Sequence, residues 1–156
     1  MKSSSRGVTL IEMLLVVAIV GMLTAISFPA VTSGIDSLRL ASATDSVVSF
    51  FNAGLNRAER RQQLIEIVVS KPERSLTMRS SERGFLRRIE LPEGIAIVSI
   101  LPEGREEKDG GRRFVLYPGG VVPRIGVELA NRKGTRRIVR VDPITGVPQI
   151  ERVEGK

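Results

Sequence analysis

The sequence of 156 residues contains no Cys, no His and no Trp, and it contains only one Tyr. The absence of Cys excludes disulfides, thiolate metal sites and cysteine nucleophiles. The absence of His removes the commonest general base and the commonest neutral metal ligand. No glycine-rich phosphate loop follows an expected strand and opens a helix. We therefore expect no enzymatic activity, no catalytic residues, no metal and no cofactor.

The charge of the chain is positive, with 24 Lys and Arg against 17 Asp and Glu, which gives a formal net charge of +7. Hydrophobic residues make up 42% of the chain, which is enough for a modest core and argues against wholesale disorder. We expect one folded domain after the amino-terminal region, and no second one.

A long uncharged run extends from Met13 to Ile35. As a helix with a rise of about 1.5 Å per residue, this run spans roughly 34 Å, close to the hydrocarbon core of about 30 Å. The cations ahead of it are Lys2 and Arg6. By the positive-inside rule, the amino terminus lies in the cytoplasm. We therefore expect a single-pass protein of the bacterial inner membrane with a periplasmic or otherwise extracytoplasmic head.

An ordinary secretory signal peptide is the alternative interpretation of this region. Met13 to Ile26 would be its apolar part and Ala25-Ile26-Ser27 its cleavage site, which would leave a secreted domain. Two features count against it. Glu12 lies at the start of the apolar run, where a charge raises the free energy of membrane entry by about 2.5–3.5 kcal/mol. Pro29 follows the supposed cleavage site, and the apolar periodicity continues beyond it.

The segment Arg6-Gly7-Val8-Thr9-Leu10-Ile11-Glu12, followed by an apolar helix, resembles the type III signal of type IV pilins and type II secretion pseudopilins. In those proteins a prepilin peptidase cuts after the glycine and methylates the next residue. The resemblance implies cleavage after Gly7 and methylation of Val8, where family members usually carry Phe. It also implies a leader at residues 1–7 and a transmembrane helix at residues 8–35.

The same resemblance implies a role for Glu12 in filament assembly. Its carboxylate would face the charged amino terminus of a neighbouring subunit, and this pairing would offset the cost of a charge in the membrane. The alternative is a first-turn Glu favoured by the helix dipole, a contribution of only some tenths of a kcal/mol.

An amphipathic extension of the helix is expected over residues 36–63. Apolar residues recur there at spacings typical of one helix face, namely Leu40, Val47, Phe51, Leu55 and Ala58. Pro29 is the expected kink, since a proline removes one helical hydrogen bond and crowds the preceding turn. Pilin-like proteins share this arrangement of one long helix that carries a head.

The remaining residues, 64–156, read as a head domain of short strands separated by Gly and Pro turns. The expected strands are Leu64–Val69, Leu76–Met78, Phe85–Leu91, Ile95–Leu101, Phe114–Tyr117, Ile125–Leu129 and Ile138–Val141. Strict alternation over Arg124 to Leu129 indicates a sheet with one packed and one wet face. The expected fold class is α+β: a long amino-terminal helix, its first half membrane-spanning and its second half amphipathic, packed on an antiparallel β-sheet head.

Four segments resemble the GspH/FimT-like minor pseudopilins, namely Leu38–Ala43, Asn56–Glu59, Phe114–Gly120 and Ile138–Gly146. Gly119 directly follows Pro118, where that family often has an acid between them. The resemblance implies a non-enzymatic structural subunit of a type II secretion pseudopilus, a short filament for protein export. Its partners would be other pseudopilins or pilins, the prepilin peptidase and the inner membrane.

A cluster of cations in the head suggests a second function. It comprises Arg124, Arg132, Lys133, Arg136, Arg137 and Arg140, with Glu128 as the one acid among them. Such a cluster could contact DNA phosphates. Gly134-Thr135-Arg136-Arg137 is similar to the Gly-Arg-x-Arg motif of DNA-binding FimT-like minor pilins. The other interpretation is a basic outer face that keeps the head soluble or pairs with acidic neighbours in a filament.

Overall fold

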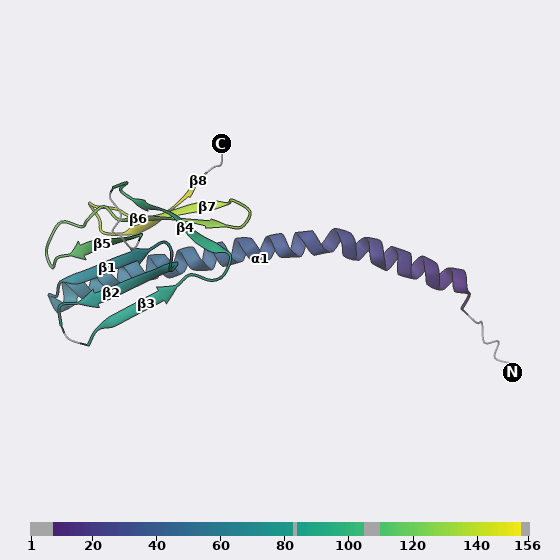
Figure 1. Ribbon diagram of the computed structural model, residues 1–156, viewed down its shortest axis with the longest axis horizontal. Coiled ribbons are helices and arrows are strands. Elements are labelled where there is room, and N and C mark those ends of the chain that lie inside the picture. Colours follow the sequence, from purple (N-terminus) through teal and green to yellow (C-terminus); the bar gives the residue numbers. More distant parts are fainter. Residues whose placement is uncertain (1–7, 83, 105–109, 154–156) are drawn as a thin grey trace. The chain divides into compact units, whose positions relative to one another are not determined.

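Figure 1 shows the computed structural model, which describes residues 8–82, 84–104 and 110–153; within the long helix, the side chains at positions 26 and 28–33 are not described. The chain divides into two compact units, Met1–Ile35 and Asp36–Lys156. One helix is followed by eight strands in the order α1 (Leu10–Arg61), β1 (Ile65–Ser70), β2 (Ser75–Ser80), β3 (Leu86–Glu90), β4 (Ile95–Leu101), β5 (Gly111–Leu116), β6 (Gly126–Asn131), β7 (Arg136–Val141) and β8 (Pro148–Val153).

Capping residues define both ends of the 52-residue helix α1. At the start, the hydroxyl oxygen of Thr9 accepts a hydrogen bond from the amide of Glu12 at 3.3 Å, as expected for an N-cap in a Thr-x-x-Glu sequence. At the end, Gln62 adopts a left-handed φ of 51°. The amide of Gln63 then donates to the carbonyl of Ala58 at 3.3 Å, which is the hydrogen bond of a Schellman motif.

The helix is assigned without a break through position 29. The side chain of Pro29 lies outside the described residues, so the kink at this position stays a prediction. In the part of the chain that the structure describes, no helix combines the length and apolarity needed to cross a membrane. The expected span, residues 8–35, includes positions 26 and 28–33, whose side chains are not among those described.

The second half of α1 packs on the head through one buried face. Leu40, Val47, Phe51 and Ala58 are buried, as the sequence predicts, and Leu55 is partly buried. Phe50, which the sequence analysis did not single out, is also fully buried, with its ring 6.4 Å from that of Phe51 in an edge-on arrangement. The buried face is therefore wider than a single stripe.

Gly54 allows the closest approach between α1 and the strands. A Cβ at this position would lie 2.9 Å from the terminal carbon of Met78 and 3.4 Å from a methyl carbon of Ile67. Both residues are fully buried in strands β2 and β1. The missing side chain therefore lets the helix backbone lie against the sheet.

The eight strands form two antiparallel sheets of four strands each, in the orders β3-β2-β1-β5 and β4-β6-β7-β8. The sequence analysis expected one antiparallel sheet, so the α+β class is confirmed and the number of sheets is corrected. The last strand, β8, was not expected. Its residues do not alternate between buried and exposed, because Gln149, Ile150, Glu151 and Arg152 are all exposed. Buried side chains of α1 and of both sheets form one core cluster.

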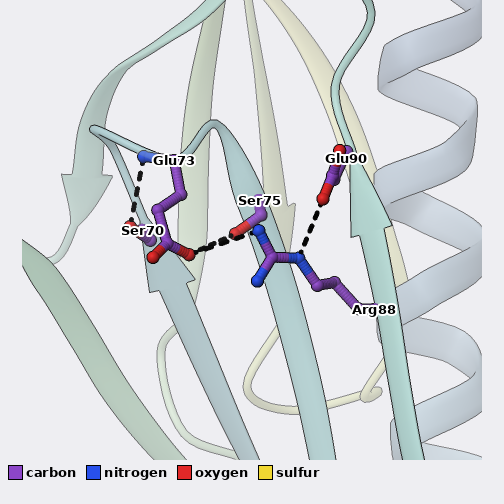
Figure 2. Close-up of polar contacts among 5 residues, drawn as sticks. All are labelled: Ser70, Glu73, Ser75, Arg88 and Glu90. Carbon is purple, nitrogen blue, oxygen red and sulfur yellow. Dashed lines mark hydrogen bonds and ion pairs between the residues drawn. The ribbon is translucent and has the colours of Figure 1, made fainter.

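A polar network ties the β1–β2 turn to strand β3 (Figure 2). The carboxylate of Glu73 accepts a hydrogen bond from the Ser75 hydroxyl at 3.2 Å and forms an ion pair with Arg88 at 3.4 Å. Arg88 also pairs with Glu90 at 3.1 Å. These side chains are well exposed to solvent, so the network organises the edge of the first sheet and contributes little to its free energy of unfolding.

Candidate functional site

The first unit presents apolar side chains around the whole circumference of α1. Residues from Leu10 to Leu23 include eleven exposed large aliphatic or Met side chains, with exposed fractions from 49% to 80%: Leu10, Ile11, Met13, Leu14, Leu15, Val16, Val17, Ile19, Val20, Met22 and Leu23. A helix that is apolar all round belongs in an apolar environment or against other apolar helices. This segment is therefore the largest unpartnered apolar surface of the described residues.

Glu12 is the only charged residue between Val8 and Ile35. It occupies the third position of α1, and its backbone amide also donates to the carbonyl of Thr9 at 3.1 Å. The side chain is exposed, as is that of Val8 at 60%. Gly7, the expected cleavage position, lies outside the described residues.

The six basic residues singled out in the sequence lie on or next to strands β6 and β7 of the second sheet, where acids neutralise two of them. Arg136 pairs with Glu128 at 3.2 Å, and the other carboxylate oxygen of Glu128 accepts a hydrogen bond from Ser99 at 2.6 Å. Arg140 pairs with Glu151 at 3.8 Å. The outer face of this sheet therefore carries both positive and negative charges. Glu151 on β8 lies outside the stretch from Arg124 to Arg140, so the sequence analysis did not consider it as a partner of the cations.

The structure does not bring the six predicted cations into one site. Arg124 precedes β6 and Arg140 is near the end of β7, whereas Arg132 and Lys133 lie in the β6–β7 hairpin at the opposite end. Six-residue strands separate these ends by about 20 Å. Neighbouring residues of a strand point to opposite faces, so Arg137 lies on the face opposite to Arg136.

One pair of these cations lines a hollow that the sequence analysis missed. Arg124 and Arg140 are among the residues that surround a space of about 400 Å³ at the end of the second sheet. Gly126, a glycine inside an alternating strand, forms part of the same wall. Such a glycine often marks a place of close approach, and it was the one signal in the sequence that could have found the hollow.

A comparison with protein families gives a match for the amino-terminal region that contains the exposed apolar helix. Residues 2–28 match the family model of the prokaryotic N-terminal methylation motif, the signature of type IV pilins and pseudopilins. The chain therefore carries a prokaryotic N-terminal methylation motif. The search of curated proteins and the search of solved structures gave no match.

The motif is known from proteins with a common biological role. Proteins that carry it are structural and non-enzymatic, are processed by a prepilin peptidase and assemble with other pilins. The match also indicates a membrane-anchored protein of bacteria. The match covers Gly7, Val8 and Glu12 and ends just before Pro29, so the head of the chain lies outside it.

Proposed function

We propose that this chain is a minor pseudopilin of the GspH/FimT-like type, a non-enzymatic subunit of a type II secretion pseudopilus. The observation that carries the proposal is the methylation motif at residues 2–28, which includes the exposed apolar helix residues from Leu10 to Leu23. In a short filament for protein export, that helix packs against equivalent helices of other pseudopilins. The head then presents its surface to neighbouring subunits.

Before assembly, the apolar helix anchors the chain in the inner membrane over residues 8–35. Lys2 and Arg6 hold the amino terminus on the cytoplasmic side. The head, with its many charged side chains, lies on the periplasmic side. Burying about eleven exposed aliphatic and Met side chains in lipid, or against other helices, supplies a favourable free energy of about 1.5–3 kcal/mol for each side chain.

The carboxylate of Glu12 sets how neighbouring subunits align along the filament. Once Gly7 is removed, the amine of Val8 carries a positive charge in the same apolar layer as the Glu12 carboxylate of a neighbour. An unpaired charge in low dielectric is costly and a paired one much less so, so this pairing favours subunits that are correctly aligned along the filament axis.

The test is the intact mass and amino-terminal sequence of the protein made with and without a prepilin peptidase. We expect a chain that begins at N-methylated Val8 when the peptidase is present and an uncut chain when it is absent. Gly7→Val should block the cut, and Ser5→Ala, a matched change in the leader, should leave it unchanged. Cleavage near Ser27, independent of the peptidase, would show a secreted domain instead.

A further inference from the structure

The hollow at the end of the second sheet is lined by a row of three residues in which a glycine lies between two longer side chains. Leu101, Gly126 and Arg140 are direct neighbours across strands β4, β6 and β7. A Cβ on Gly126 would lie 3.1 Å from the Cβ of Leu101, so even a methyl group would crowd this row. A space of about 400 Å³ lies beside this row, and all three residues are part of its lining.

The lining of this hollow, which we name the Gly126 hollow, combines apolar walls with two guanidinium groups. Leu101, Pro102 and Pro143 provide apolar surface, and Arg124 and Arg140 provide the charge. Arg140 has one acidic neighbour, Glu151, at the long distance of 3.8 Å. Among the described residues, none forms an ion pair or hydrogen bond with the side chain of Arg124. The hollow therefore has unused capacity for a carboxylate next to an apolar group.

A structured loop with exposed apolar side chains borders the hollow. The carboxylate of Asp142 accepts hydrogen bonds from the amides of Ile144 at 2.7 Å and Thr145 at 3.1 Å. The amide of Gly146 donates to the carbonyl of Asp142 at 2.8 Å, which closes the turn. Ile144 is nonetheless 92% exposed. An isoleucine held in place on such a loop loses little conformational entropy when a partner covers it.

A second loop extends this apolar border. Val121 is 87% exposed, and its neighbour Val122 would lie 3.5 Å from a Cβ placed on Gly146. The two loops are thus in contact. The second loop is also tied to the last turns of α1, where the amide of Gly119 donates to the carboxylate of Glu59 at 3.1 Å. Exposed apolar side chains that gather beside a charged hollow are typical of interaction sites.

We propose that the Gly126 hollow and the loop of Ile144 bind a peptide segment of another protein that carries aliphatic side chains next to carboxylates. Arg124 and Arg140 bind the carboxylates, and the apolar walls together with Ile144 and Val121 cover the aliphatic groups. DNA fits this site poorly, because a phosphate backbone has no aliphatic groups for the apolar border to cover. The inference goes beyond filament assembly and does not depend on it.

The experiment measures which short peptides the full chain binds. The labelled full-length protein in mild detergent is applied to an array of peptides of four compositions: aliphatic with acidic, aliphatic with basic, aliphatic with neutral polar, and acidic without aliphatic residues. Bound peptides are then titrated in solution by fluorescence anisotropy. We expect selection of the aliphatic and acidic class over the other three.

Variants then locate the binding site. The double variant Arg124→Gln/Arg140→Gln should weaken binding of the selected peptides by about tenfold or more, since charged hydrogen bonds are lost. Ile144→Ser, on an exposed loop, should weaken it several-fold without affecting folding. Arg132→Gln/Lys133→Gln removes the same charge at the opposite end of the sheet and should change the affinity by less than about twofold.

Three results would overturn the proposal. The first is an array with no preference for acidic aliphatic peptides, or with no binding at all. The second is an equal loss of affinity in the Arg132→Gln/Lys133→Gln control. The third is a short DNA duplex that binds more tightly than the selected peptides and loses its affinity in Arg124→Gln/Arg140→Gln, which would make the hollow a phosphate site. Processing at Gly7 is measured separately, so neither result depends on the other.

Discussion

At the scale of single residues, the part that Glu12 plays in helix capping can be separated from the charge-pairing role that we propose for it. Its backbone amide takes part in the capping of α1 by Thr9, and its carboxylate is the one charge in a long apolar segment. The first role needs only the main chain. The second needs the negative charge, because only a carboxylate can neutralise an amine in an apolar layer.

Glu12→Gln should therefore leave membrane insertion intact and reduce incorporation into filaments by about tenfold or more, since loss of one partner of a buried ion pair costs about 3–5 kcal/mol. The measurements are the amount of protein in the membrane fraction and its cross-linking to neighbouring pilin-like subunits. Thr9→Ala is the matched control: it weakens the helix cap by about 1 kcal/mol and should leave incorporation nearly unchanged. Normal incorporation of Glu12→Gln would refute the charge-pairing role.

Asp142 is a residue of the head whose ionisation is coupled to the structure of its own loop. The amide of Ile144, followed by that of Thr145, holds the pKa of the Asp142 carboxyl below its ordinary value of 3.8. A lowered pKa means that the carboxylate stabilises the loop fully above pH 3.8 and loses this effect as the pH falls through the lower pKa of the folded protein.

We expect hydrogen exchange at the amides of Ile144 and Thr145 to speed up relative to the rest of the head below that pKa. Asp142→Asn keeps an acceptor oxygen that does not ionise, so the amides of its loop should stay protected from exchange both above and below that pKa. Asp142→Ala removes the acceptor and should lose protection at every pH. Acid-induced loosening of the loop that persists in Asp142→Asn would mean that another group is responsible.

At the scale of elements, one helix serves two environments. The described side chains at the start of α1, from Leu10 to Leu23, are apolar and exposed on every side apart from Glu12, whereas the second half of the helix buries one face against two sheets and exposes the other. The difference lies in the residues around the helix axis, since charged side chains reappear only from Asp36 onward. The same backbone geometry can thus support an anchor and a core element.

Phe50→Ala should lower the free energy of unfolding of the head by about 3–5 kcal/mol, because it leaves a cavity at a fully buried position. Leu38→Ala, on the same helix but 70% exposed, should change it by less than about 0.5 kcal/mol. Urea unfolding of the full chain in detergent, followed by circular dichroism, measures both. Equal losses for the two variants would contradict the packing described for α1.

At the scale of the whole molecule, the proposed function requires the two ends of the chain to lie on opposite sides of the inner membrane. The chain has no Cys, so single-cysteine variants report position without interference from native thiols. Ser3 lies in the expected leader, and Ser42 is exposed on the second half of α1.

In a host without prepilin peptidase, a membrane-impermeant maleimide added from the periplasmic side should label Ser42→Cys. It should label Ser3→Cys only after the inner membrane is disrupted. The physical reason is the positive charge of Lys2 and Arg6, which retains the short amino terminus in the cytoplasm. Labelling of Ser3→Cys in intact membranes would reverse or abolish the proposed topology.

The sequence by itself determined the features that depend on neighbours along the chain. The methylation motif, the apolar segment with its single Glu12, the helix up to Arg61 and seven of the eight strands follow from local spacing and capping. Strand β8 was missed because its residues do not alternate between buried and exposed positions. Helical hydrogen bonds and strand periodicity are set within a few residues, so a linear pattern reveals them.

Only the tertiary structure decided which strands meet. The division into two sheets, the ion pair of Arg140 with Glu151 and the row of Leu101, Gly126 and Arg140 all depend on pairing between distant segments. This pairing also separates cations that lie close together in the sequence. Successive residues of a strand point to opposite faces, and the cations of the β6–β7 hairpin lie at the end of the sheet opposite to Arg124 and Arg140. Strand partners are selected by burial in a shared core, and that selection is a property of the folded chain.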